Sequence, residues 1–273
     1  MMGANYSQMF PGRPHFTEKN LPSLASKVFL VTGGNAGIGL ALAKILYSKN
    51  ATVYIAGRSM EKIKAAIEEI KNEFPLGTGQ LKALLVDLAD LDSTKAGAAE
   101  FLAQETRLDV LFLNAGVAQI PAGTITKHGH EIHMGTNCVG PFLLTQLVLP
   151  TLLKTAESEP TGSVRVVWTS SGIIDLDPIQ GGLRLEELVA GHHGKVTSQN
   201  YTSSKSGNWF LAAELDKRVR NSGVISVTQN PGTINTKGWN VFPWIKLLFK
   251  PIMYEAVFGA YTECKRMLLK FYN

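Results

Sequence analysis

Short apolar runs alternate with longer segments of helical spacing from Lys27 to Val227. The apolar runs predict strands at 27–33, 51–57, 81–88, 108–116, 164–171 and 224–232. The segments between them predict helices, most clearly at 38–48, 61–72, 94–105, 136–153 and 201–220. Alternating strands and helices are typical of a parallel sheet, and nearly continuous apolar strands indicate burial on both faces. The pattern therefore predicts a single, doubly wound α/β domain with helices on both faces of a mostly parallel sheet.

The two ends of the chain depart from this alternation. Residues 1–26 contain several prolines and predict an extended arm, 27–236 form the main body, and 237–273 form a lid and tail of the same domain. Residues 239–261 are apolar, but prolines and charges interrupt them, so no transmembrane helix is predicted. They fit a lid or an amphipathic segment in peripheral contact with a membrane.

Composition narrows the function classes. The chain has 273 residues, 45% of them hydrophobic, which is enough for a sizeable core. Lys and Arg outnumber Asp and Glu by 27 to 22, and because the excess is spread along the chain, no nucleic-acid partner is predicted. Cys138 and Cys264 lie far apart in the sequence, so neither a disulfide framework nor a zinc site is expected. A reducing compartment, the cytoplasm, is the predicted location.

The first predicted strand runs directly into the glycine-rich segment TGGNAGIG, residues 32–39, and a predicted helix follows. Glycines at such a junction allow a tight turn and a close approach of the backbone to a pyrophosphate, which the helix N-terminus attracts. A purely structural glycine turn is the alternative. The strand before and the helix after favour dinucleotide binding.

Two further positions bear on which dinucleotide binds. Arg58 follows the second strand, where an acidic residue would bind the adenosine ribose of NAD. A guanidinium suits a 2′-phosphate, so NADP(H) is predicted, with a solvated loop arginine as the alternative. Asp87 ends the third strand, where a carboxylate can hold the adenine or cap the next helix.

Six motifs occur together in an order that resembles the short-chain dehydrogenase/reductase family. They are TGGNAGIG at 32–39, LNAG at 113–116, TNCVG at 136–140, SS at 170–171, YTSSK at 201–205 and NPGTINT at 230–236. Parts of the chain are most similar to fungal members related to retinol dehydrogenases. The resemblance implies a Rossmann-type fold and an NADP(H)-dependent oxidoreductase that interconverts a carbonyl and an alcohol. A non-catalytic NADP(H)-binding sensor or interaction protein is the alternative.

The resemblance also implies four catalytic residues. Tyr201 would exchange a proton with the substrate oxygen, and Lys205, one helical turn later, would favour its phenolate. Ser171, with Ser170 as the alternative, would orient that oxygen. Asn137 would hold a water that relays protons to Lys205.

Cofactor contacts are implied in the same way, and no metal is expected. The contacts are Gly33, Asn35, Gly37, Ile38, Gly39, Arg58, Asp87, Asn114, Ala115, Gly116, Lys205, Pro231, Gly232 and Thr236. His128, His130 and His133 lie close together in the sequence, but no acid at ligand spacing completes a metal site.

Substrate, assembly and the tail are further expectations from the resemblance. The loop 172–200 is longer than in simple family members, and long loops in compact domains are usually functional. Together with the apolar segment 239–261, it predicts a small lipophilic carbonyl or alcohol as substrate. A homodimer is expected, through the helix 94–105 or through the Asn137 and Tyr201 helices. The family's final edge strand is not evident, so the tail either lacks it or docks in another way.

Overall fold

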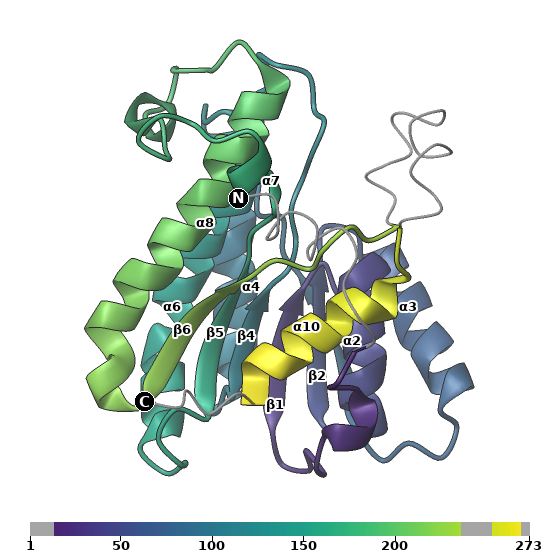
Figure 1. Ribbon diagram of the computed structural model, residues 1–273. Helices are drawn as coiled ribbons and strands as arrows, with labels where there is room; N and C mark the ends of the chain where they lie inside the picture. The colour runs from purple at the N-terminus through teal and green to yellow at the C-terminus, as the bar shows by residue number, and fades with distance from the viewer. Residues whose placement is uncertain (1–13, 236–252, 269–273) are drawn as a thin grey trace.

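The computed structural model describes residues 14–235 and 253–268. Its core is one six-stranded sheet in the order β3-β2-β1-β4-β5-β6, and all neighbouring strands are parallel (Figure 1). The strands are β1 Val28–Thr32, β2 Thr52–Gly57, β3 Gln80–Leu85, β4 Val110–Leu113, β5 Val164–Thr169 and β6 Val224–Gln229. Strand order reverses between β1 and β4, which in open parallel sheets is where ligands bind, beyond the carboxyl ends of the strands.

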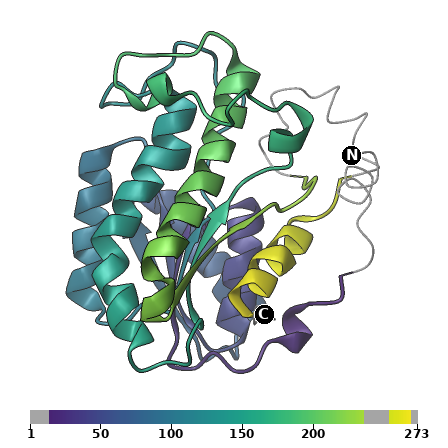
Figure 2. The same ribbon diagram turned by 60° about the vertical axis from the view of Figure 1, so that its left-hand side comes forward.

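Helices cover both faces of the sheet (Figures 1 and 2). The longer helices are α2 Gly37–Ser48, α3 Met60–Glu73, α4 Leu91–Gln104, α6 Gly140–Ala156, α8 Thr197–Val219 and α10 Ala256–Leu268. The short ones are η1 Glu18–Asn20, α5 Ile132–Met134, the π-helical turn η2 Gly135–Val139, α7 Ile173–Leu176, η3 Leu185–Leu188 and η4 Arg220–Ser222. One apolar core joins the sheet to α4, α6 and α8, and a second joins it to α2, α3 and α10.

The two cores follow from the alternation of side chains along each strand. In β1, Leu30 belongs to the core under α4, α6 and α8, whereas Phe29 and Val31 belong to the opposite core. All five residues of β1 are buried because helices cover both faces. The predicted doubly wound fold is thereby confirmed.

The predicted strands and helices are present, with shifts at their boundaries. The helix predicted at 94–105 begins at Leu91, because Asp90 caps it by accepting a hydrogen bond of 3.0 Å from the Asp92 N–H. The helix predicted at 136–153 is part of a longer helical run that begins at Ile132 and contains a π-helical turn around Asn137. Such turns are rare in helices and often occur at functional sites.

The C-terminal helix α10 packs in the groove beside α2 on the second face of the sheet (Figure 1). Ala260, Cys264 and Met267 form its buried stripe, and Arg165 of β5 donates a hydrogen bond to the Arg266 carbonyl near its end. Among the described residues, β6 is the edge of the sheet and no further strand pairs with it. Residues 239–252 of the expected lid lie outside the described residues.

One helical run, Ile132–Ala156, is long and apolar enough to cross a membrane by length and composition alone. Half of its most apolar window is buried inside the fold, and buried core helices of other proteins meet the same criterion. The description covers only residues 14–235 and 253–268.

Candidate active site

The glycine-rich turn between β1 and α2 is tightly packed and leaves the start of the helix open. Gly33 and Gly37 have positive φ angles of 67° and 54°, which favour glycine. A Cβ added to Gly39 would lie 2.6 Å from Asn114 Nδ2, so only glycine fits there. Ala36, at the N-cap of α2, makes no side-chain capping hydrogen bond. The first N–H groups of α2 are therefore unoccupied by a cap and suited to bind an anion.

Asn35 and Arg58 lie near the end of β2. A Cβ added to Gly57 would lie 2.8 Å from Asn35 Oδ1, so the Asn35 side chain packs directly on the end of this strand. Arg58 follows at once and is exposed. Both of these predicted contacts thus lie on the same side of the glycine-rich turn.

Asp87 does not cap the next helix, whose N-cap is Asp90. The Asp87 carboxylate accepts a hydrogen bond of 3.0 Å from the Ala89 N–H, and the Asp87 N–H donates to Ser93 Oγ over 3.0 Å. These contacts fix the turn before α4, with the Asp87 side chain half-buried. The carboxylate stabilises local backbone whether or not it also reaches an adenine.

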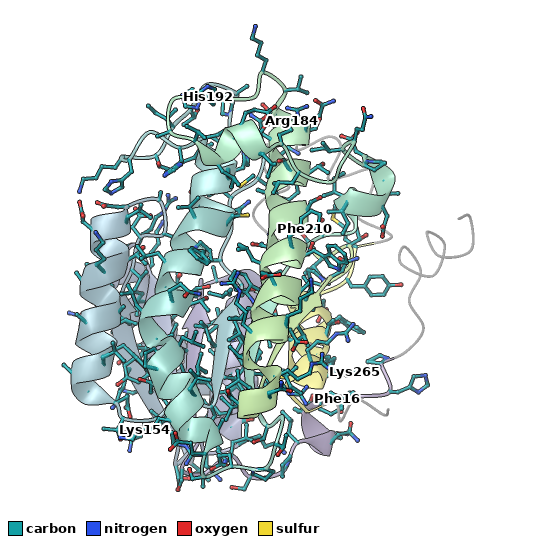
Figure 3. All side chains as sticks on the ribbon, turned by 90° about the vertical axis from the view of Figure 1, so that its left-hand side faces the viewer. Phe16, Lys154, Arg184, His192, Phe210 and Lys265 are labelled. Atoms are coloured by element: carbon teal, nitrogen blue, oxygen red, sulfur yellow. The ribbon has the colours of Figure 1, made fainter. Side chains whose placement is uncertain are left out.

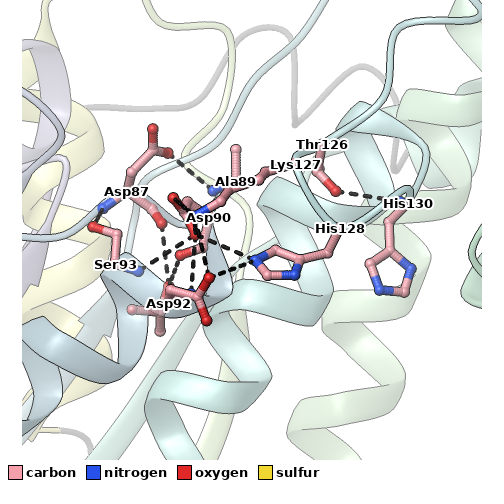
Figure 4. A network of polar contacts seen from close by, with 10 residues as sticks. Asp87, Ala89, Asp90, Asp92, Ser93, Thr126, Lys127, His128 and His130 are labelled. Carbon is pink, nitrogen blue, oxygen red and sulfur yellow. Dashed lines mark hydrogen bonds and ion pairs between the residues drawn. The ribbon is translucent and has the colours of Figure 1, made fainter.

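Asp90, Asp92 and His128 bring their ligand atoms within 4.8 Å of one another (Figure 4). No acid stands at ligand spacing from these histidines in the sequence, but the fold brings Asp90 and Asp92, from the start of α4, to His128. The Lys127 ammonium already lies between them, 2.9 Å from Asp90 and 3.1 Å from Asp92, and its hydrogen bond lowers the pKa of Asp90 to about 2. The cluster is therefore a set of ion pairs that connects the loop after β4 to the start of α4.

The predicted catalytic residues Asn137, Tyr201 and Lys205 converge beyond the carboxyl ends of β4 and β5. The Lys205 ammonium lies 5.7 Å from the centre of the Tyr201 ring and donates to the Thr169 carbonyl over 2.9 Å. A Cβ added to Gly116 would lie 3.1 Å from Asn137 Oδ1 and 3.3 Å from Lys205 Nζ. Glycine at position 116 therefore leaves room between these side chains.

Asn137 is held rigidly by two neighbours. Its amide exchanges hydrogen bonds with the Val117 backbone, accepting over 2.8 Å and donating over 3.0 Å. It also donates to Ser204 Oγ over 2.9 Å, which joins the π-helical turn to α8. The loop after β4 and the first turns of α8 are thus connected through one side chain.

The two serines after β5 differ in accessibility. Ser170 is buried, and its hydroxyl donates to the Lys205 carbonyl over 2.8 Å. Ser171 is partly exposed, accepts only a long contact of 3.3 Å from the Ile173 N–H, and lines a cavity of about 210 Å³ with Ile174 and Trp209. Ser170 lines the same cavity, but Ser171 is the more exposed of the two residues.

The remaining predicted cofactor residues lie at the ends of β4 and β6. Asn114 donates to the Thr32 carbonyl over 3.0 Å, and the Ala115 N–H donates to Thr32 Oγ1 over 3.0 Å, which ties β4 to the glycine-rich turn. Pro231 and Gly232 follow β6, where Gly232 has a φ of 83°. Thr236 lies outside the described residues.

Three buried ionisable residues near this site were not anticipated as a group. Glu131 and His133 form a fully buried pair beside Tyr201, and Glu263 of α10 is fully buried beneath Thr169. Burial raises the pKa of Glu263 to about 7. His133 had been considered only as a metal ligand, and no pattern in the sequence distinguishes either glutamate from an exposed one.

The loop between β5 and α8, here called the excursion, projects at the N-terminal end of α8. Arg184 and His192 lie on it (Figure 3). It exposes several large apolar side chains, including Leu176, Leu185 and Val189 at 60%, 69% and 55% exposure. The excursion lies directly between Ser171 and Tyr201 in the sequence, so it borders the candidate site.

Comparisons with known proteins agree with this geometry. A family model described as short chain dehydrogenase matches residues 27–177. A short-chain dehydrogenase/reductase of Phomopsis amygdali is 47% identical over 94% of this chain and 78% of its own length. Another, from Pestalotiopsis fici, is 45% identical over 94% of this chain and 80% of its own length.

Solved structures show the same fold. A protein from Mycobacterium Paratuberculosis matches with a TM-score of 0.69 and 27% identity, covering 94% of this chain and 81% of that one. A metagenomic short-chain oxidoreductase, solved in complex with NADP, matches with a TM-score of 0.64 and 24% identity, covering 90% of this chain and 93% of that one.

Proposed function

This chain belongs to the short-chain dehydrogenase/reductase family of oxidoreductases, and from that premise we propose that it interconverts a carbonyl and an alcohol on a lipophilic small molecule, with NADP(H) as cofactor. The observation that carries the proposal is the convergence of Tyr201, Lys205 and Asn137 next to the uncapped start of α2. A buried ammonium beside a tyrosine ring is the arrangement that proton transfer at a substrate oxygen requires.

The residues around the glycine-rich turn fit a dinucleotide. The N–H groups at the start of α2 would bind the pyrophosphate, and the missing side chain of Gly39 lets the turn pack on Asn114. NADP(H), when bound, supplies or accepts the hydride. Arg58 and Asn35, both at the end of β2, support a preference for the 2′-phosphate of NADP(H) over NAD(H).

The protein's own residues would handle the proton. Tyr201 would donate its hydroxyl proton to the carbonyl oxygen during reduction and take it back during oxidation. The Lys205 ammonium, fixed by the Thr169 carbonyl, would stabilise the phenolate that remains. Ser171 would donate a hydrogen bond to the same substrate oxygen, while Ser170 holds α8 against β5. Asn137 would hold the water that returns the proton to Lys205.

The surroundings of Ser171 support a lipophilic substrate. Ile174 and Trp209 line the cavity next to this serine, and the neighbouring excursion exposes Leu176. Apolar walls with a few convergent polar groups are typical of small-molecule sites. Phe142 of α6 and Phe210 of α8 are exposed, which supports the expected pairing of two copies of the protein through these helices. We propose the cytoplasm as the location of the enzyme.

Turnover with purified protein tests the proposal directly. NADPH and NADH consumption would be followed against aldehydes, ketones and quinones of graded lipophilicity, and the greatest rate is expected with NADPH and an apolar carbonyl. Tyr201→Phe should lower kcat by at least about 10²-fold, because the proton donor is lost. Tyr47→Phe, a matched change far from the site, should leave kcat unchanged.

Binding of the cofactor has its own measurement. NADPH should raise the melting temperature of both the wild-type protein and Tyr201→Phe, because binding to the folded state alone stabilises it. Unchanged melting in the presence of NADPH would refute the cofactor. Full activity of Tyr201→Phe across the panel would refute the catalytic role of the tyrosine.

A further inference from the structure

Glu131 and His133 form an ion-pair-like contact that is fully enclosed in the protein. Both side chains have 0% exposure, and Glu131 Oε1 lies 2.8 Å from His133 Nδ1. The Ile120 N–H donates to His133 Nε2 over 3.3 Å, so this nitrogen acts as an acceptor. The ring proton therefore resides on Nδ1 and is donated to Glu131. The His133 ring is thereby held by hydrogen bonds at both of its nitrogens.

The carboxylate is stabilised by more than the histidine. Glu131 Oε2 accepts a hydrogen bond of 2.9 Å from the Met134 N–H, and Oε1 also accepts from Asn200 Nδ2 over 3.3 Å. Burial acts to raise the pKa of Glu131, but the hydrogen bonds from His133 and Met134 outweigh it, so the pKa lies below its usual value. A buried carboxylate with three N–H donors remains ionised and fixed in place.

Each of these donors leads to a residue of the catalytic centre. The His133 ring packs edge-on against the Tyr201 ring, with centroids 6.1 Å apart and planes at 73°. Asn200 immediately precedes Tyr201 in the first turns of α8 and is also tied to the Gly194 carbonyl over 3.0 Å. Glu131 thus restrains the tyrosine twice, through its ring and through its backbone.

The third donor fixes the other side of the site. Glu131 is the N-cap of the short helix α5, because its carboxylate accepts from Met134, and this helix continues into the π-helical turn that carries Asn137. The cap sets where the helical run begins and therefore which direction Asn137 faces. Tyr201 and Asn137 come from distant parts of the chain, and one buried carboxylate contacts the segments that hold both.

We infer that Glu131, acting with His133, is a positioning residue that holds Tyr201 and Asn137 in register for proton transfer. The inference rests on the proposed function but concerns two residues to which that function assigns no contact with the cofactor or the substrate. A displacement of a reacting group by about 1 Å can lower an enzymatic rate about 10²-fold, so loss of this register should reduce the chemical step.

The test compares Glu131→Gln with Asp216→Asn. Glutamine retains the shape of the side chain but replaces one carboxylate oxygen with an NH₂ group. That NH₂ group cannot accept a hydrogen bond, so at least one of the N–H groups that donate to Glu131 loses its acceptor. Asp216, in α8 like Tyr201 but at the far end of that helix, is a buried carboxylate that accepts from the Ser226 N–H over 3.0 Å and from the Arg220 guanidinium. Both variants therefore neutralise a buried acid that binds backbone.

Glu131→Gln should lower kcat about 10²-fold while the dissociation constant of NADPH stays within twofold of the wild-type value. The isotope effect with deuterated NADPH should rise, because the chemical step becomes limiting. Asp216→Asn should leave kcat and the isotope effect unchanged, and Glu131→Asp should recover part of the loss in kcat. Equal kcat values for Glu131→Gln and Asp216→Asn would overturn the inference.

Hydrogen exchange gives a readout that does not depend on turnover. Peptides covering 196–204 and 132–140 should exchange faster in Glu131→Gln than in the wild type, and these peptides should be unchanged in Asp216→Asn. If the wild-type protein reduces no carbonyl, the proposed function fails and this exchange pattern alone decides the inference. Unchanged exchange in both peptides would then overturn it.

Discussion

Two buried glutamates approach the candidate site from opposite faces of the sheet, and their surroundings differ. Glu131 lies on the side of α6 and α8 and accepts hydrogen bonds from His133, Met134 and Asn200. Glu263 lies on α10, where Thr169 Oγ1 donates over 2.8 Å and Gln229 Nε2 over 2.6 Å, both to Oε1. Its Oε2 is buried without a hydrogen-bond partner among the described residues.

The comparison separates burial from hydrogen bonding as causes of a pKa shift. Both side chains have 0% exposure, yet the pKa of Glu131 lies below its usual value and that of Glu263 is raised to about 7. Desolvation acts on both in the same direction, so the number and placement of the donors make the difference. Glu131 therefore stays ionised at neutral pH, whereas Glu263 changes its charge near neutral pH.

Removal of the Glu131 side chain should have the largest effect on stability. Glu131→Ala leaves three buried donors without their acceptor and opens a cavity, which we expect to cost about 3 kcal/mol in the free energy of unfolding at neutral pH. Chemical denaturation measures the loss. Glu263→Ala should lower the free energy of unfolding by less at this pH. Part of the native Glu263 population is ionised there, and this buried charge, whose hydrogen bonding is incomplete, already costs stability in the wild type. A greater loss for Glu263→Ala would reverse the comparison.

The pH dependence of stability should distinguish the two glutamates by sign. The folded-state pKa of Glu263 exceeds its ordinary value of 4.5, so its contribution is complete below that value and is lost as the pH rises through about 7. Relative to Glu263→Gln, the wild-type protein should lose about 2 kcal/mol of stability between about pH 5 and about pH 7.5. Denaturant titrations at several pH values measure this difference.

Glu131 should behave in the opposite way over a different range. Its folded-state pKa is below the ordinary value of 4.5, so its contribution is present above that value and is lost as the pH falls. Between pH 5 and pH 7.5 the stability difference between wild type and Glu131→Gln should therefore be nearly constant. If the stability difference from the wild type changed with pH in the same way for Glu131→Gln and Glu263→Gln, the two environments would not differ as described.

The alternation of apolar runs and helical segments was sufficient to predict the sheet, because burial on both faces forces strands such as β1 to be apolar throughout. A local contact explains one boundary error: Asp90 caps α4, which begins at Leu91, three residues before the predicted start. The π-helical turn at Asn137 was not predictable, because its geometry depends on Glu131 and on Ser204, which lies 67 positions away in the sequence.

The same limit applies to the charged residues of the site. A motif placed Tyr201 and Lys205, since four positions along a helix return to the same face. Glu131 and Glu263 carried no such pattern, because the groups that accommodate them lie far away in the sequence: Asn200 is 69 positions from Glu131, and Thr169 is 94 positions from Glu263. The sequence left Ser170 open as an alternative to Ser171, and the structure distinguishes them by the burial of Ser170 and its bond to the Lys205 carbonyl.

Thr169 offers the smallest and most specific change on the Glu263 side. Its hydroxyl donates to Glu263 Oε1 and accepts from Gln229 Nε2 over 3.1 Å. Its carbonyl accepts from Lys205 Nζ, so Thr169→Val removes both hydroxyl contacts and keeps the carbonyl contact. A hydrogen bond to a charged group contributes more than one to a neutral group, and we expect a loss of about 1.5 kcal/mol at pH 8 and less at pH 5. Because Thr169 lowers the pKa of Glu263, the midpoint of the stability change should also move to higher pH. A loss that is equal at both pH values would show that Thr169 contributes by packing alone, and that Glu263 does not ionise beside it.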